Sequence, residues 1–235
     1  MKKIQMLYHR QAIALSDEMT AMRQAGFLVG TEPMHEADTI IYRGPTMWSQ
    51  PDYPKIEKGI QTWESYSGTL FLSNYYPYIE EITIPTFFSD KLDESVIREI
   101  HRRKWNEVII KNDVSAIIQH GEILSAWPQY SMECIEERFA ALPQTSCYAI
   151  RKRIPMQLYE EERYWVLNNR AYHRSKIIPD IVNEAIERLK PIGSKYYVID
   201  ALPEMIVEVN PGESSDRYID NSPELFAGWF RDAFL

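Results

Sequence analysis

The chain has 235 residues, of which 45% are apolar and 26% charged, as in an ordinary globular protein of one large or two small domains. Its net charge of −8 argues against a nonspecific nucleic-acid binder, which needs a strongly basic surface. No apolar run reaches transmembrane length, the N-terminus lacks a signal-like stretch, and the two cysteines lack metal-ligand spacing, so we expect a cytoplasmic protein with reduced thiols and no membrane partner.

The first elements in chain order alternate between strand and helix patterns. Ile4 to Tyr8 reads as a strand, and Ala12 to Gln24 has helical spacing that stops at Gly26. Short strands follow at residues 27–30 and 39–43. This order predicts an α/β opening with a parallel sheet.

The next stretch reads less clearly. Residues 44–67 carry several aromatics and prolines and predict a loop followed by a helix around Ile56 to Tyr66. Thr69 to Ser73 is apolar enough for a buried strand, and Ile82 to Phe88 resembles an exit from the first unit. We therefore place a domain boundary near residue 85.

The remainder predicts a second unit of mixed helices and antiparallel strands. A helix is expected at 92–103 and another at 178–190, where apolar residues form one stripe. Asn168-Asn169 predicts a tight turn, because asparagine tolerates positive φ. The other expected elements are strands at 107–111 and 147–154, a pair at 116–120 and 121–124, hairpin strands at 162–167 and 170–174, and a final helix at 223–235 packed through Leu225, Phe226, Trp229 and Phe230.

A second hairpin, from Tyr196 to Gly212 around a Leu-Pro-Glu turn, carries three oxygen-bearing side chains. Asp200 lies near the end of its first strand, and Glu208 and Asn210 lie two apart on its second, so they project from the same face. Carboxylate and amide oxygens suit Mg²⁺, which is usually completed by phosphate oxygens. A plain surface hairpin also has one polar face, but here no Lys or Arg interleaves to compensate the acids.

The order of these motifs resembles the ATP-grasp superfamily. Val-Ile-Ile-Lys111 ends one strand, a strand around Ala149 to Ile154 follows, and Arg163 opens a hairpin that returns through Arg170 and Arg174. The closing Asp200 … Glu208-Val-Asn210 resembles the glutathione-synthetase-like and ribosomal-protein glutamate-ligase-like branch.

The resemblance covers essentially the whole chain and implies a fold that combines α/β and α+β parts. Residues 1–85 would form a small N-terminal α/β pre-ATP-grasp domain. Residues 86–235 would form a two-subdomain ATP-grasp domain, divided into about 86–146 and 147–235.

The resemblance also implies a nucleotide site. Lys111 would contact the α- and β-phosphates of ATP, and Lys91 occupies the place of an earlier phosphate-binding lysine. The hinge strand would meet adenine, largely through the backbone groups of Ala149, Ile150, Arg151 and Lys152.

The metal and the reacting phosphoryl group would lie at the C-terminal hairpins. Asp200, Glu208 and Asn210 would hold Mg²⁺, and Arg163 or Arg174 would face the γ-phosphate. Lysines, arginines and Mg²⁺ stabilise phosphoryl transfer electrostatically, without a covalent nucleophile on the enzyme. The resemblance thus implies an ATP-dependent carboxylate–amine ligase that works through an acyl phosphate and releases ADP and phosphate.

Departures from the family pattern keep two alternatives open. Lys111 is followed by Asn-Asp-Val-Ser-Ala, without the usual glycine-rich loop, and Arg151-Lys152-Arg153 stands where the hinge often carries an acidic residue. Glu160 to Glu162 are candidates for ribose contacts. Lys111-Asn-Asp113 also resembles the start of a nucleotidyltransferase or nucleic-acid-ligase motif, with Val114 in place of glycine. The missing loop equally fits a noncatalytic nucleotide-binding interaction protein.

Arg43, at the end of a strand in the α/β unit, is a further carboxylate-binding candidate.

Overall fold

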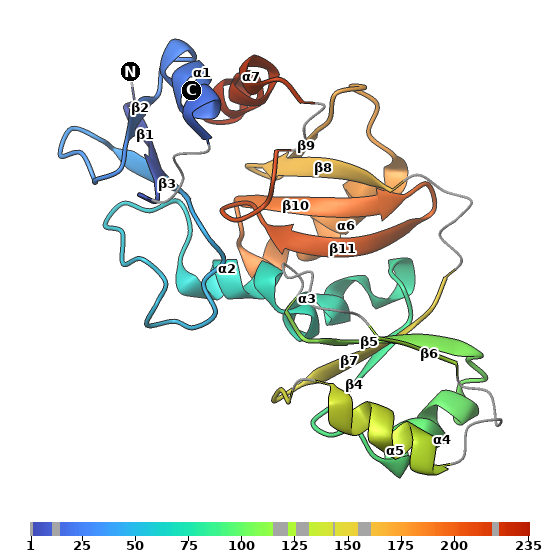
Figure 1. The fold of residues 1–235 in the computed structure, drawn as a ribbon. Helices are drawn as coiled ribbons and strands as arrows, with labels where there is room; N and C mark the ends of the chain where they lie inside the picture. Colours follow the sequence, from blue (N-terminus) through green and yellow to red (C-terminus); the bar gives the residue numbers. More distant parts are fainter. Residues whose placement is uncertain are drawn as a thin grey trace.

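The structure, a computed structural model, describes residues 2–10, 15–114, 122–125, 132–142, 144–154, 161–217 and 221–235. Three sheets organise this part of the chain: one of three strands and two of four. Figure 1 shows them in a row, with the N-terminal sheet at one end and the sheet of β5 (Glu107–Asn112) and β7 (Tyr148–Lys152) at the other. No helix among the described residues is both long enough and apolar enough to cross a bilayer.

The N-terminal sheet is parallel, as predicted, in the order β2-β1-β3. Its strands are β1 (Ile4–Tyr8), β2 (Leu28–Gly30) and β3 (Thr39–Arg43), and every side chain of β1 is buried. The helix between β1 and β2 is α1 (Ser16–Gln24), and residues 12–14 of the predicted helix lie outside the described residues.

Two helices replace the strand expected at 69–73, so that prediction was wrong. Helix α2 (Trp63–Leu70) begins at the capping box of Thr62 and Ser65, later than the predicted helix at 56–66. After the extended residue Phe71, α3 (Leu72–Ile79) and the 3-10 turn Glu80–Ile82 follow. The buried side chains of α3 are spaced as one helical stripe, at positions 72, 75, 76 and 79.

The middle sheet is antiparallel, in the order β4-β7-β5-β6. Helices α4 (Glu94–Arg102) and α5 (Met132–Ala141) accompany it, and its core includes Val96, Ile100, Phe139 and Ile150. The predicted strand at 116–120 and residue 121 lie outside the described residues, and β6 pairs with β5. The strands of this sheet are β4 (Thr86–Ser89), β5 (Glu107–Asn112), β6 (Glu122–Ser125) and β7 (Tyr148–Lys152). The sheet therefore extends beyond the expected subdomain border at 146/147.

The C-terminal sheet is built from the two predicted hairpins, in the order β11-β10-β8-β9. Its strands are β8 (Glu162–Leu167), β9 (Arg170–Tyr172), β10 (Tyr196–Leu202) and β11 (Met205–Pro211). Asn168 and Asn169 turn the first hairpin with φ of 50° and 62°. Helix α6 (Asp180–Leu189), extended by the 3-10 turn Lys190–Ile192, and helix α7 (Pro223–Phe234) complete this part.

The two faces of the C-terminal sheet bury different partners. On one face, Trp165, Tyr196 and Val198 share a core with β1 and with Phe226 and Phe230 of α7. The other face packs on α3 and α6, through residues that include Tyr75, Ile186, Tyr197, Ile199 and Val209. Leu225 was expected in the α7 packing but is 36% exposed. The N-terminal sheet and α7 thus pack on one face of the C-terminal sheet, and α3 and α6 pack on the other (Figure 1).

Candidate nucleotide and metal site

Three strands place an arginine and two acids in one row. Asp200 of β10 lies opposite Arg163 of β8 on one side and opposite Glu208 of β11 on the other. Asn210 lies two residues beyond Glu208, on the same side of β11. The register therefore brings together the three oxygen-bearing residues that the sequence singled out.

Arg163 and Asp200 form a bidentate ion pair. Arg163 Nε and Nη2 donate to Asp200 Oδ1 and Oδ2 at 2.7 and 2.8 Å. Asp200 is only 2% exposed, and burial raises its pKa, although Arg163 and Asn210 oppose the rise by stabilising the charged form.

Lys111 reaches the same row from the middle sheet. Its Nζ is paired with Glu208 Oε1, and both side chains are mostly buried. The expectation that no cation would stand beside the acids was therefore wrong, because Lys111 and Arg163 come from strands that are distant in sequence. The pair also joins β5 to β11 across the space between the two sheets (Figure 1).

The amide of Asn210 completes the donor set. Its Nδ2 donates to Asp200 Oδ2 at 3.0 Å, whereas its Oδ1 is buried and has no hydrogen-bond partner within the described residues. Among those residues no three His, Cys, Asp or Glu side chains gather in a metal-binding group. Two carboxylates and an orphaned amide oxygen nevertheless suit a Mg²⁺ ion that takes its other ligands from phosphate and water.

The hinge prediction needs correction at Ala149, Ile150, Arg151 and Lys152. Strand β7 pairs with β4 over Tyr148–Arg151 and with β5 over Tyr148–Lys152, so its backbone groups are engaged on both sides and do not face a ligand. The side chains of Ala149 and Ile150 are fully buried in two different cores. The pairing continues to the Arg153 N–H, which donates to the Glu107 carbonyl at 3.0 Å, and residues 155–160 lie outside the described part.

Arg151 has a structural role that the sequence did not indicate. It is 6% exposed and donates from Nη2 to the carbonyl of Val207 at 2.8 Å and from Nε to Thr86 Oγ1 at 3.3 Å. Next to it, an apolar cluster draws Ile84 from the middle part and Leu202 and Val207 from the C-terminal hairpin, with Ile154 and Met205 packed against it.

Lys91 lies just after β4. Ser89, the last residue of β4, and Asn112, the last residue of β5, both pair with Tyr148, so the two strands end at the same edge of the sheet. Lys91 and Lys111 therefore lie near the same end of this sheet. Its side chain is 65% exposed and pairs with Asp93 at 2.8 Å.

Arg174 and the glutamates at the start of β8 differ in how close they lie to the row of acids. Arg174 is exposed, in the turn after β9 at the opposite edge of the sheet from β11. Glu160 lies outside the described residues, and Glu162 accepts a hydrogen bond from the Tyr164 hydroxyl at 2.8 Å. Glu161 is exposed, but desolvation and the charges of Asp200 and Glu208 raise its pKa, and the sequence did not indicate that it lies near these acids.

Arg43 is not available to a carboxylate substrate. Its Nε and Nη2 donate to Glu18 at 2.9 and 3.1 Å, and both side chains are buried. Its Nη1 donates to the carbonyls of Gly212 at 3.0 Å and Ser215 at 2.7 Å. Arg43 therefore ties the N-terminal unit to the segment that leaves β11.

Asp113, part of the nucleotidyltransferase-like motif, caps a helix. Its carboxylate accepts from the Ser73 backbone N–H at 2.7 Å and from the Ser73 hydroxyl at 2.5 Å, at the start of α3. This contact accounts for Asp113 without any nucleotide chemistry.

Comparisons with known proteins reveal likeness in structure only. No protein-family model matches the chain, and no curated protein matches its sequence. The structure of ATP-grasp ligase PsnB with a minimal precursor superposes with a TM-score of 0.65 at 9% identity, covering 99% of each chain. D-cycloserine synthetase DcsG gives 0.66 at 13% identity over 97% of this chain and 99% of the other.

A third solved structure carries a bound peptide. The macrocyclase MdnC with precursor peptide MdnA, from Microcystis aeruginosa MRC, gives a TM-score of 0.64 at 10% identity over 99% of this chain and 100% of the other. At such low identities these likenesses concern the fold, and they confirm the fold that the sequence analysis expected.

Proposed function

Because the chain has the ATP-grasp fold, we propose that this protein is an ATP-dependent carboxylate–amine ligase that works through an acyl phosphate and releases ADP and phosphate. The observation that carries the proposal is the meeting of Lys111 from one sheet with Arg163, Asp200, Glu208 and Asn210 from the next. Cations and oxygen ligands facing one another between two sheets match the needs of phosphoryl transfer.

Asp200, Glu208 and Asn210 would hold Mg²⁺, with the orphaned Asn210 Oδ1 as a ready ligand. The bound metal would neutralise charge on the β- and γ-phosphates. To hold the metal, Asp200 and Glu208 would have to be released from their ion pairs with Arg163 and Lys111. Once released, Lys111 would bind phosphate oxygens, and Arg163 would stabilise the charge that develops on the transferred phosphoryl group.

The adenine ring would lie at the apolar cluster of Ile84, Leu202 and Val207, which lies between the sheets next to the acids. Backbone groups beyond the Arg153 N–H, which is bonded to Glu107, would replace those of 149–152 as its hydrogen-bond partners. Lys91 would supply a second phosphate contact, and Arg174, at the far edge of the sheet, would be dispensable for the chemistry.

The carboxylate substrate would attack the γ-phosphorus atom, forming the acyl phosphate and releasing ADP. An amine would then attack the acyl carbon, forming the amide and releasing phosphate. We propose a peptide as one of the two substrates, since solved structures of MdnC and PsnB contain the precursor peptides MdnA and PsnA2.

The test is calorimetric titration with ATP, with and without Mg²⁺, of the wild-type protein, Glu208→Gln and Glu204→Gln. Glu204 is an exposed residue in the turn of the same hairpin and serves as a matched control. We expect Mg²⁺-dependent binding that Glu208→Gln weakens at least tenfold and Glu204→Gln leaves unchanged. Wild-type protein that does not bind ATP with Mg²⁺, or equal binding by both variants, would refute the metal site.

Two alternatives are separated by further readouts. The ion pairs that occupy both metal-binding carboxylates favour a noncatalytic nucleotide-binding protein as the second candidate. Firm ATP binding without ADP release in the presence of acids and amines would support it. Label transfer from α-labelled ATP to Lys111 would instead revive the nucleotidyltransferase hypothesis, for which Asp113 now has a structural explanation.

A further inference from the structure

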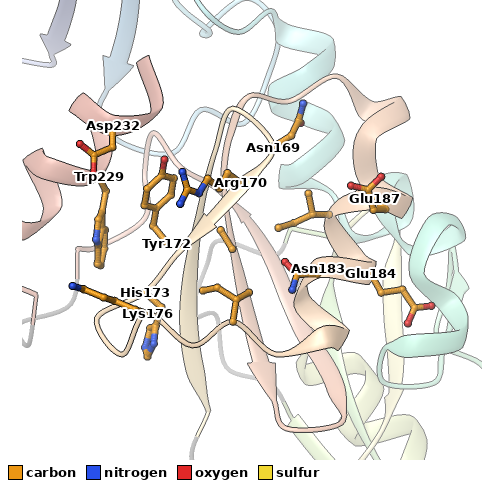
Figure 2. A pocket seen from close by; sticks show the side chains of 13 residues that line it. Asn169, Arg170, Tyr172, His173, Lys176, Asn183, Glu184, Glu187, Trp229 and Asp232 are labelled. Atoms are coloured by element: carbon orange, nitrogen blue, oxygen red, sulfur yellow. The ribbon is translucent and has the colours of Figure 1, made fainter. Parts of the chain in front are cut away.

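The free edge of the C-terminal sheet is a slot between two helices. Strand β9 is the last strand of the order β11-β10-β8-β9, so no strand among the described residues pairs with its outer side. Helix α6 packs on one face of the sheet and α7 on the other. Figure 2 shows β9 between side chains of both helices, with Asn183, Glu184 and Glu187 on one side and Trp229 and Asp232 on the other.

The backbone of Ala171 faces this slot. In the two-residue turn at Asn168-Asn169, Leu167 and Arg170 form the closing hydrogen-bonded pair, so the next pair, Val166 and Ala171, is not hydrogen-bonded. The N–H and C=O of Ala171 therefore point away from β8. No hydrogen bond to either group occurs within the described part of the chain.

A cavity of about 750 Å³ lies along this edge. Successive residues of β9 line the cavity on opposite faces of the sheet. On the α6 side, the small side chain of Ala171 leaves room beside Ile178 and Ile186. On the α7 side, the cavity is bounded by Tyr172 and Trp229, whose rings are 6.3 Å apart.

Exposed apolar surface continues beside the cavity. Ile177, one residue before the lining residue Ile178, is 74% exposed. A single exposed apolar side chain is common on protein surfaces, so Ile177 adds apolar contact area next to the cavity but does not by itself require a partner.

We propose that this slot binds an extended peptide, which adds as a further strand to β9 and pairs with the backbone of Ala171. An open backbone donor and acceptor flanked by side chains of two faces recognise a strand, because the backbone supplies affinity and alternate side chains supply specificity. The residue opposite Ala171 is apolar and fills the space beside Ile178 and Ile186. Its neighbours in the peptide lie against Tyr172 and Trp229. This site is distinct from the row of acids, which lies toward the other edge of the sheet.

Ala171→Pro tests the proposal, because it removes the outward N–H, which takes no part in the ladder with β8. Proline is tolerated at an edge position whose N–H is not part of the ladder. Ala171→Ser keeps both the N–H and the small side chain and serves as the matched control. Seven-residue peptides are selected from a displayed library on the full-length wild-type chain without nucleotide, and their binding is measured by fluorescence anisotropy.

We expect enriched peptides with apolar residues at alternate positions, binding the wild type and Ala171→Ser alike and Ala171→Pro at least tenfold more weakly. Hydrogen exchange of the wild type supplies an independent readout: saturating peptide should slow exchange at residues 170–173. A selection without binders, equal binding to Ala171→Pro, or unchanged exchange at β9 would overturn the proposal. Because these assays contain no ATP, failure of the ligase proposal would leave them unaffected, and Ala171→Pro should still bind Mg²⁺–ATP.

Discussion

Glu213 is a buried carboxyl just after β11 whose charge is only partly compensated. Its Oε1 accepts hydrogen bonds from Gln61 Nε2 at 2.6 Å and from the Tyr53 hydroxyl at 3.3 Å, and its Oε2 has no partner within the described residues. Burial raises the pKa of Glu213 to about 7, against the opposing effect of these hydrogen bonds and of Arg43.

The free energy of unfolding should therefore fall as the pH rises from the pKa of Glu213 in the unfolded chain to its pKa in the folded protein. In this range the carboxyl is ionised in the unfolded chain but still protonated in the folded protein. The ordinary pKa is 4.5, so the folded state binds the proton more tightly between pH 4.5 and about 7. The destabilisation develops over this window and levels off above it, with an upper size on the order of 3 kcal/mol.

Glu213→Gln should flatten this pH dependence while keeping the shape of the side chain. Urea unfolding of both proteins at pH 5 and pH 8 measures the difference. A slope that is unchanged in Glu213→Gln would show that Glu213 is already ionised at low pH in the folded protein.

The sequence pattern identified some residues of the candidate site but not the buried Glu213. Asp200, Glu208 and Asn210 were found because their spacing on a hairpin determines the face they share. Glu213 stands in no chemical pattern, and its environment comes from Gln61, 152 positions earlier in the chain. The roles of all these residues in catalysis remain predictions.

At the scale of elements, the turn between β8 and β9 depends on two left-handed residues. Asn168 and Asn169 both have positive φ, which most residues adopt only at a cost of about 1–2 kcal/mol. Their identity was the reason that the hairpin was predicted correctly.

Asn169→Ala should lower the free energy of unfolding by about 1 kcal/mol, whereas Asn169→Gly, the preferred second residue of this turn type, should preserve or raise it. Urea midpoints of the three proteins give the comparison. Equal losses in the alanine and glycine variants would mean that the asparagine side chain, and not its backbone conformation, stabilises the turn.

Helices α2 and α3 explain the main error in predicted elements. Residues 69–73 are locally apolar, which fits a strand, but the buried positions 72, 75, 76 and 79 follow the helical period over a longer window. Phe71 has an extended backbone and separates the two helices, so the short apolar segment around it resembles a strand.

At the scale of the whole molecule, the ends of the chain meet. Helix α7, the last element, packs with α1 and β1 in the core that also contains Trp165 and Tyr196 (Figure 1). We therefore expect the N-terminal unit to unfold together with the C-terminal sheet, in one transition.

Phe230→Ala should test this coupling. Phe230 is fully buried against Tyr196 and Phe226, so its truncation should cost about 4 kcal/mol, whereas Leu225→Ala, on the exposed side of the same helix, should cost less than about 1 kcal/mol. Hydrogen exchange should show equal destabilisation of β1 and β10 in Phe230→Ala. Loss of protection in β1 alone would show that the two parts unfold independently.

The sequence by itself determined most elements, the two C-terminal hairpins and the face shared by the acids, because local periods and turn residues act over a few positions. Only the tertiary structure decided that Lys111 and Arg163 pair with those acids, that β7 is an interior strand, and that Arg43 and Glu213 are buried. Those outcomes depend on which strands become neighbours and what they exclude from water, and both are settled by packing between segments far apart in the chain.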